Sequence, residues 1–173
     1  MLQILESRKR HVNAVVVTGG EPTMHADLPK FLMKLKERGF CVKLDTNGFF
    51  PDVLETSLQY VDYVALDVKT SLEKYYRLGA NDVNKFLRTI EILKHGNVDY
   101  EFRTTVVPSF VDEEDIPKIG ESVKGVKRFV FQQFIPNDTL DKSFNKVKPC
   151  SPEAIAGFAD IMKKYAREVL LRV

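Results

Sequence analysis

The chain has 173 residues, of which 44% are hydrophobic and 29% charged, and its formal net charge is +2. This length and composition predict a single globular domain over residues 1–173 with a substantial core. The near-neutral charge and the lack of a long basic cluster argue against nucleic acid as a partner. No apolar run is long enough to span a membrane, and the first ten residues are not a signal peptide. Cys41 and Cys150 lie far apart, which favours a reduced, cytoplasmic protein.

Strand and helix patterns alternate along the chain, as apolar residues recur with a period of two or of 3.6. The first half predicts a helix over 2–11, a strand over 14–18, a helix over 27–38, a strand over 40–46, a helix over 51–59 and a strand over 61–69. The second half predicts a loop or short helix over 70–81, a helix over 82–96, a strand over 98–106, a helix over 113–123, a strand over 127–134, a polar loop over 136–150, a helix over 151–168 and a strand over 169–173. Repeated βα units imply a parallel sheet, either open or curled into part of a barrel.

The segment VVVTGGEPT at 15–23 is the most informative stretch. Val15–Val17 are typical of a strand that is buried on both faces. Gly19 and Gly20 allow a sharp turn and a close approach to a ligand, and Pro22 stiffens that turn. Glu21 follows at the C-terminal end of the strand, where α/β folds place their chemistry. A glycine pair after a strand is by itself most often only a turn.

Polar side chains also follow the four later strands. Asp45 and Asn47 end one strand in LDTNG, Asp67 and Lys69 end the next in ALDVKT, and Arg103 lies in EFRTTVVP. A fifth strand ends in FQQFIPN. In a parallel sheet these ends lie at one mouth. Two carboxylates beside a lysine and an arginine suit a ligand with both an amine and a carboxylate, or a cation held by oxygen atoms.

Each of these side chains also fits a purely structural role. Asp45, with the Asn-Gly pair after it, is typical of a self-satisfied turn. Asp67 and Lys69 share a strand face and suit an ion pair, and Arg103 is placed to pair with Glu101. The two glutamines of the fifth strand suit an exposed edge. The same pattern at five strand ends favours a ligand site over five unrelated structural contacts.

In this order, on successive strands, the GGEP, DTNG, DVK and RTTVVP motifs resemble the radical S-adenosylmethionine (radical SAM) superfamily. The chain is most similar there to glycyl-radical-enzyme activases, the anaerobic ribonucleotide reductase activating and pyruvate formate-lyase activating enzymes. The resemblance covers nearly the whole chain and implies an α/β fold, an incomplete parallel (β/α) barrel. It also implies the family reaction, reductive cleavage of S-adenosylmethionine to methionine and a 5′-deoxyadenosyl radical that takes a hydrogen atom from a glycine of a partner enzyme.

The resemblance implies a role for each motif. GGEP at 19–22 holds the amino group of S-adenosylmethionine, the two aspartates lie near its carboxylate, and the lysine and arginine neutralise that carboxylate or approach the ribose. FQQFIP at 131–136 matches the last strand of the family's partial barrel, whose end packs against the adenine. The implied contacts are Gly19, Gly20, Glu21, Pro22, Asp45, Asn47, Asp67, Lys69, Arg103, Gln133, Phe134 and Pro136. In the formate-lyase activase group a monovalent cation also lies at the positions of Asp45, Thr46 and Asp67, with the carbonyl of Leu66 contributing.

The chain departs from the family at its iron–sulfur site. The family binds a [4Fe–4S] cluster through C-x-x-x-C-x-x-C, and such clusters require thiolates. This chain lacks that motif: Cys41 begins a strand and is expected to be a core residue, and Cys150 lies in a loop. We therefore expect no iron–sulfur ligands and no activity from this chain alone. The pattern also predicts a truncated partial (β/α)6 barrel that lacks its first strand, either as a fragment or as a subunit whose cluster half lies on another chain.

These expectations extend to partners and to other functions. A glycyl radical enzyme is the partner that the resemblance implies, and the sheet edge before the strand over 14–18 is expected to pair with a second copy or another chain. No nucleic acid or membrane partner is expected. Two alternatives stay open: a non-catalytic domain for S-adenosylmethionine or nucleotide binding or for assembly, and a radical SAM enzyme that acts on a small purine-like molecule.

Overall fold

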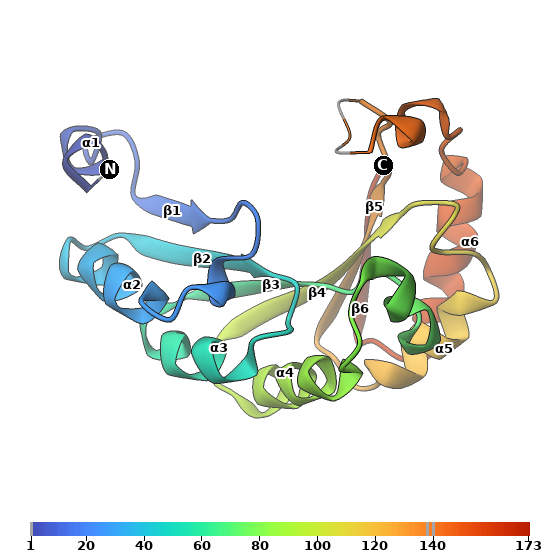
Figure 1. Ribbon diagram of the computed structural model, residues 1–173, viewed down its shortest axis with the longest axis horizontal. Coiled ribbons are helices and arrows are strands. Elements are labelled where there is room, and N and C mark those ends of the chain that lie inside the picture. Colours follow the sequence, from blue (N-terminus) through green and yellow to red (C-terminus); the bar gives the residue numbers. More distant parts are fainter. Residues whose placement is uncertain (1, 138, 140) are drawn as a thin grey trace. The chain divides into compact units, whose positions relative to one another are not determined.

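A computed structural model describes residues 2–137, 139 and 141–173 (Figure 1). The α-helices are α1 (Leu2–Ser7), α2 (Leu28–Glu37), α3 (Pro51–Ser57), α4 (Val83–His95), α5 (Asp115–Ser122) and α6 (Pro152–Met162). The strands are β1 (Ala14–Val17), β2 (Cys41–Thr46), β3 (Tyr63–Asp67), β4 (Asp99–Val106), β5 (Arg128–Gln133) and β6 (Glu168–Arg172). Short 3₁₀ helices are η1 (Pro22–Met24), η2 (Leu58–Tyr60), η3 (Leu72–Leu78) and η4 (Lys142–Lys146).

The strands form a six-stranded sheet in the order β1-β2-β3-β4-β5-β6. The pairs β1–β2, β2–β3, β4–β5 and β5–β6 are parallel. This arrangement confirms the predicted α/β fold with a parallel sheet. No helix in the described residues is long and apolar enough to cross a membrane.

Two compact units divide the chain, one formed by residues up to Asp67 with Asn84–Tyr100, the other by Val68–Val83 with Glu101–Val173. The first unit contains β1, β2 and β3 with α2 and α3. Leu28, Leu32 and Leu35 form the buried stripe of α2, at the spacing of one helix face. The prediction of a single domain remains a prediction.

The burial of β1 differs from the prediction. Residues 15–17 were predicted to be buried on both faces, but Val16 is 51% exposed and Val15 and Val17 are only half-buried. The reason is position: β1 is the first strand of the sheet, and among the described strands it pairs with β2 alone. An edge strand can keep a β-branched sequence without the burial that such a sequence usually indicates.

The second unit contains β5, β6, α5 and α6. Phe131 of β5 lies 6.4 Å from Phe158 of α6 between ring centroids, and both side chains are buried. Ser151 caps α6 by accepting a hydrogen bond from Ala154 N–H at 3.2 Å, as its sequence predicts. The predicted end at 168 is wrong, because the Tyr165 carbonyl accepts from Gly125 N–H at 2.7 Å and the chain leaves the helix toward β6.

The N-terminal helix is also shorter than predicted. It ends at Ser7 rather than at 11, and Arg8, Lys9 and His11 instead donate backbone hydrogen bonds to residues three positions earlier. Such bonds are typical of turns and of tight helix ends. After Leu5 the sequence has no apolar residue until Val12, so no apolar stripe extends the helix across a core.

Candidate functional site

The GGEP turn directly follows β1. Gly19 and Gly20 have φ values of +93° and +55°, which L side chains adopt only with strain. A Cβ atom added at either glycine would meet nothing within 4 Å among the described residues, so the space in front of the turn is open. Glu21 then caps η1, with its side chain accepting a hydrogen bond from Thr23 N–H at 3.1 Å.

The Glu21 carboxylate ties this turn to the turn after β2. It is 8% exposed, and its Oε1 accepts hydrogen bonds from the hydroxyls of Thr23 and Thr46, the latter at 2.7 Å. Its Oε2 accepts from Asn47 N–H at 2.6 Å. Both oxygens of a buried carboxylate are thus used inside the protein. The GGEP and DTNG motifs therefore form one hydrogen-bonded structure, which we call the Glu21 network: Glu21, Thr23, Thr46 and Asn47.

Asp45 and Asp67 lie on the same face of the first unit's sheet. Asp45 is in register with Ala65, so Asp67 lies two residues further along the neighbouring strand. Lys43 is on the same face of β2, and its Nζ lies 2.9 Å from Asp45 Oδ1. The structure therefore brings together the two predicted carboxylates and adds a lysine that the motif analysis did not include.

The Asn47–Gly48 turn is also structural in its own right. Asn47 Oδ1 accepts from Phe49 N–H at 3.0 Å, as Asx turns do. Gly48 has a φ of +81°, and a Cβ there would approach Leu66 Cδ1 to 2.7 Å and Phe86 Cδ2 to 3.0 Å. The structural explanation of this turn is therefore correct for Asn47 and Gly48, alongside any role in ligand binding.

In the second unit, Arg103 of β4 is half-buried and in register with Val130. The face of Arg103 therefore carries Gln132, whereas Gln133 lies on the opposite face and donates to the Cys150 carbonyl at 3.2 Å. The structure does not bring the predicted Gln133 beside Arg103.

The segment after β5 has mixed exposure. Phe134 is 8% exposed, Pro136 is half-buried, and Ile135 between them is 64% exposed. Ile135 is thus an apolar side chain that FQQFIP exposes to solvent. The motif analysis did not single it out.

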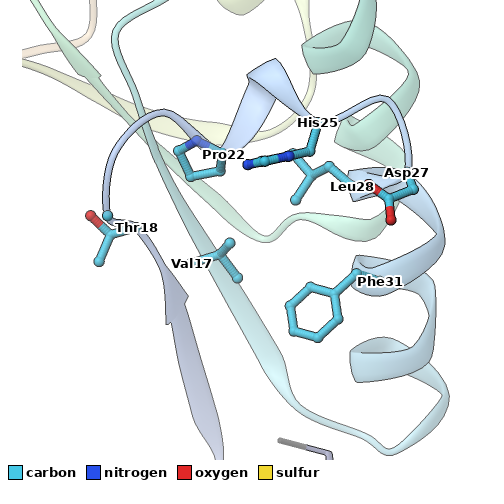
Figure 2. A pocket seen from close by; sticks show the side chains of 8 residues that line it. Val17, Thr18, Pro22, His25, Asp27, Leu28 and Phe31 are labelled. Carbon is cyan, nitrogen blue, oxygen red and sulfur yellow. The ribbon is translucent and has the colours of Figure 1, made fainter.

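A cavity of about 430 Å³ lies in the first unit next to the GGEP turn (Figure 2). Val17, Leu28 and Phe31 supply apolar walls, and His25 and Asp27 also line it. The cavity includes Gly19 and Pro22 of the turn but neither Asp45 nor Asp67.

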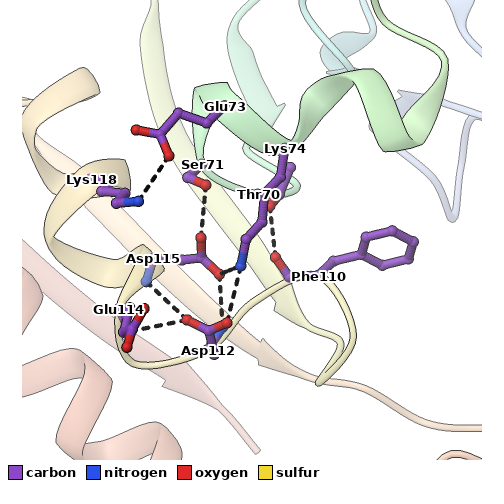
Figure 3. Close-up of polar contacts among 9 residues, drawn as sticks. All are labelled: Thr70, Ser71, Glu73, Lys74, Phe110, Asp112, Glu114, Asp115 and Lys118. Carbon is purple, nitrogen blue, oxygen red and sulfur yellow. Dashed lines mark hydrogen bonds and ion pairs between the residues drawn. The ribbon is translucent and has the colours of Figure 1, made fainter.

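A buried ion-pair network follows the DVK motif (Figure 3). Asp115, 1% exposed, accepts hydrogen bonds from Lys74 Nζ at 2.6 Å, from Ser71 Oγ at 2.7 Å and from Asp112 N–H at 3.0 Å. Burial raises the pKa of Asp115, but these hydrogen bonds, led by that from Lys74, bring the pKa below its ordinary value. The same contact with Asp115 raises the pKa of Lys74. This network fixes η3 to the start of α5.

The two cysteines do not form a metal site. Cys41 is exposed, so its expected place in the core is wrong; it begins β2 on the strand face that it shares with the half-buried Lys43 and Asp45, opposite the buried Val42 and Leu44. Cys150 is half-buried, and burial raises the pKa of its thiol, which disfavours the thiolate that binds iron. Among the described residues, no three His, Cys, Asp or Glu side chains are grouped to hold a metal ion.

A family model described as the Radical SAM superfamily matches residues 1–123. The chain belongs to the radical SAM superfamily. Within it, the chain is 39% identical over 169 residues to a Methanocaldococcus jannaschii protein named as a glycyl-radical enzyme activating enzyme, covering 92% of this chain and 70% of that protein. It is 27% identical over 137 residues to a pyruvate formate-lyase-activating enzyme of Clostridium pasteurianum, covering 76% of this chain and 56% of that protein.

Two further proteins are also similar to this chain. It is 26% identical over 144 residues to a 7-carboxy-7-deazaguanine synthase of Thermococcus kodakarensis, covering 83% of this chain and 55% of that protein. A solved domain of pyruvate-formate lyase-activating enzyme from Bacteroides vulgatus has a TM-score of 0.69 at 16% identity, covering 90% of this chain and 98% of that one. This structural likeness shows the partial-barrel fold alone.

Three residues that contact the predicted site residues were themselves absent from the predicted site: Thr23, Lys43 and Tyr75. For the first two the sequence contained a signal. Thr23 follows the GGEP motif and lies two residues after the capping glutamate, a spacing typical of a capped turn. Lys43 is two residues before Asp45, which places both on one strand face. Tyr75 binds the backbone of Lys69 from six residues away, and no local pattern predicts that bond.

Proposed function

We propose that this chain binds S-adenosylmethionine and that it serves radical chemistry on a glycyl radical enzyme. The observation that carries the proposal is the Glu21 network. It holds the open Gly19–Gly20 turn against the turn that follows Asp45, so two motifs far apart in sequence form one structure. Family membership supports the class of ligand, and the glycyl-radical activating relative supports the class of partner.

The donor set fits the ligand. Backbone carbonyls and carboxylates suit an amino group, and Lys69 and Arg103 suit a carboxylate. The residues proposed to contact S-adenosylmethionine are Gly19, Gly20, Glu21, Pro22, Asp45, Asn47, Asp67, Lys69, Arg103, Gln133, Phe134 and Pro136. In this family the bound ligand supplies a radical. The protein's own part is to orient the ligand and keep water from it.

The Glu21 network limits how Glu21 acts in this proposal. Its two oxygens already accept hydrogen bonds from Thr23, Thr46 and Asn47. We therefore propose that Glu21 acts chiefly by holding the carbonyls of the turn in place. A monovalent cation at Asp45, Thr46 and Asp67 is part of the proposal, and Lys43 beside Asp45 competes with it for that carboxylate.

A [4Fe–4S] cluster does not fit the residues of this chain. Its two cysteines, Cys41 and Cys150, lie in different compact units, and neither belongs to a C-x-x-x-C-x-x-C motif. We propose that this chain is inactive without a cluster held elsewhere. The chain spans 55% and 56% of two relatives, so the activity of a whole enzyme is a proposal here.

A second candidate function is chemistry on a small purine-like molecule. The observation that favours it is the likeness to 7-carboxy-7-deazaguanine synthases, at 26% and 28% identity in two archaea. The glycyl-radical candidate is stronger because its relative is 39% identical and is covered over 70% of its length. A role limited to binding or assembly is the third.

We also propose that the open edge of β1 pairs with another chain, a second copy being the simplest case. β1 has β2 as its one sheet neighbour among the described strands, and Val16 on it is 51% exposed. Sedimentation velocity tests this directly. A dimer is expected, and a monomer at all concentrations contradicts the pairing of two copies.

Calorimetry with S-adenosylmethionine tests the binding proposal. We expect saturable binding by the wild-type chain and a clear loss with Asp67→Ala, which removes one carboxylate of the proposed site. Asp160→Ala is the matched control, because Asp160 is exposed on α6 and pairs there with Lys163. Absence of binding by the wild-type chain refutes the proposal, and equal loss in both variants refutes the role of Asp67.

A further inference from the structure

We propose that Tyr75 is a positioning residue for Lys69, an assignment that rests on the proposed S-adenosylmethionine site. Tyr75 lies in η3, after the DVK motif, and is 2% exposed. Its phenolic oxygen accepts the backbone N–H of Lys69 at 3.1 Å. Tyr75 therefore acts on the lysine through the backbone.

Each residue from 68 to 71 is anchored by a different part of the second unit. Val68 donates its N–H to the Arg103 carbonyl at 2.8 Å, and its carbonyl accepts from Thr104 Oγ1 at 2.6 Å. Thr70 Oγ1 donates to the Phe110 carbonyl at 2.6 Å (Figure 3). Ser71 Oγ donates to the buried Asp115 carboxylate. These contacts leave the backbone on both sides of Lys69 with defined positions.

Lys69 is the exposed residue of this anchored segment. Val68 and Thr70 are each 1% exposed and Ser71 is fully buried, but Lys69 among them is exposed. A backbone held this firmly pays less entropy when the lysine side chain meets an anion. The arrangement is thus suited to present one cation at a fixed point on an otherwise buried segment.

The Tyr75 hydroxyl contacts Lys69 itself. The anchors at 68, 70 and 71 hold its neighbours, whereas Tyr75 binds the Lys69 N–H directly. Removing the hydroxyl leaves that N–H without this acceptor while the ring keeps its packing. The peptide that carries the lysine then gains freedom, although the fold of the segment is retained.

The test compares Tyr75→Phe with Tyr76→Phe. Tyr76 is the next residue and is 69% exposed, so the same substitution there is a matched control. Binding of S-adenosylmethionine is measured by calorimetry for both variants, and Tyr75→Phe is repeated in a Lys69→Met background. Amide hydrogen exchange at Lys69, measured without ligand, reports the anchor independently of binding.

We expect Tyr75→Phe to weaken binding about three- to tenfold, the range of one neutral hydrogen bond. Tyr76→Phe should leave the affinity unchanged. In the Lys69→Met background, Tyr75→Phe should change the affinity less than twofold, because its effect passes through Lys69. The Lys69 amide should exchange about tenfold faster in Tyr75→Phe alone.

Three results overturn the inference. Equal weakening by Tyr75→Phe in both backgrounds shows a general structural role. Unchanged exchange at the Lys69 amide shows that the anchor does not exist. An affinity unaffected by Lys69→Met removes Lys69 from the site, although binding by the wild-type chain then still supports the proposed function. Failure of the wild-type chain to bind instead refutes the proposed function itself, and the exchange measurement still decides the anchor.

Discussion

Glu21→Gln is the substitution that tests the Glu21 network most sharply, because it keeps the shape of the side chain and changes one acceptor into a donor. If the amide nitrogen takes the place of Oε2, it faces the Asn47 N–H, which now bonds Glu21 at 2.6 Å. If it takes the place of Oε1, it faces the Thr23 N–H and two hydroxyls. In either orientation one backbone N–H loses its partner.

The magnitude follows from burial and charge. Glu21 is 8% exposed, so water replaces the lost partner poorly. A hydrogen bond to a charged group contributes about 1.5–3 kcal/mol, and an unsatisfied buried donor costs about 1–3 kcal/mol. We therefore expect Glu21→Gln to lower the free energy of unfolding by about 2–4 kcal/mol. The affinity for S-adenosylmethionine should fall as well, because the Gly19–Gly20 turn loses its support.

Urea denaturation measures this loss, and Glu37→Gln is the control. Glu37 is exposed on α2, and its substitution should change the free energy by less than about 0.5 kcal/mol. Amide exchange at Asn47 adds a local measurement and should become faster in Glu21→Gln alone. If both variants unfold at the same urea concentration and Asn47 exchanges at its wild-type rate, the reasoning about the network is refuted.

Two further predictions concern stability elsewhere. The pKa of Asp115 is lowered in the folded chain, so Asp115 contributes fully to folding stability above about pH 4, and this contribution is lost as the pH falls through the folded pKa. The pKa of Lys74 is raised, so Lys74 contributes fully to folding stability below about pH 10, and this contribution is lost as the pH rises through the folded pKa. Asp115→Asn should flatten both limbs of a stability–pH curve, and an unchanged curve contradicts this. Gly48→Ala should lower the free energy of unfolding by about 2–4 kcal/mol, because it adds a steric clash at a residue with positive φ. Gly79→Ala, where φ is +76° and the space is open, should lower it by about 1 kcal/mol. Equal losses in the two variants contradict the packing argument.

The order of elements was predictable because each helix and strand carries its own local pattern. Leu28, Leu32 and Leu35 recur on one helix face, and Ser151 with its following proline marks the start of α6. The ends of helices were less predictable. α6 ends at Met162 because the carbonyl of Tyr165 bonds to Gly125 forty residues earlier, and no local pattern contains that contact.

The burial of a residue was predictable where side-chain type decides it, and not where its place in the sheet decides it. Residues 15–17 look like a central strand, yet the place of β1 at the sheet edge leaves Val16 exposed. Cys41 looks like a core residue from its side-chain type, but it begins β2 on the less buried face of that strand and is exposed. Which strand lies at an edge is decided by the pairing of the whole sheet, so composition within one strand cannot reveal it.

The candidate site shows the same limit. Strand order and register place Asp45 and Asp67 on one face, as the motifs predict. Alternation along β5 places Gln132, and not Gln133, on the face of Arg103, which depends on a register known only from the pairing. The hydrogen bond from the Lys69 N–H to the Tyr75 hydroxyl joins the segment after β3 to η3 and has no counterpart in any sequence period.

Titration of the isotope-labelled chain with S-adenosylmethionine, followed through its backbone amide resonances, tests both whether this ligand binds and where it binds. We expect saturable shifts concentrated at Gly19, Gly20, Asn47 and Lys69, with the resonances of α6 unchanged. Shifts confined to the cavity lined by His25 and Phe31 contradict the proposed site, and no shifts at any concentration contradict S-adenosylmethionine binding by this chain.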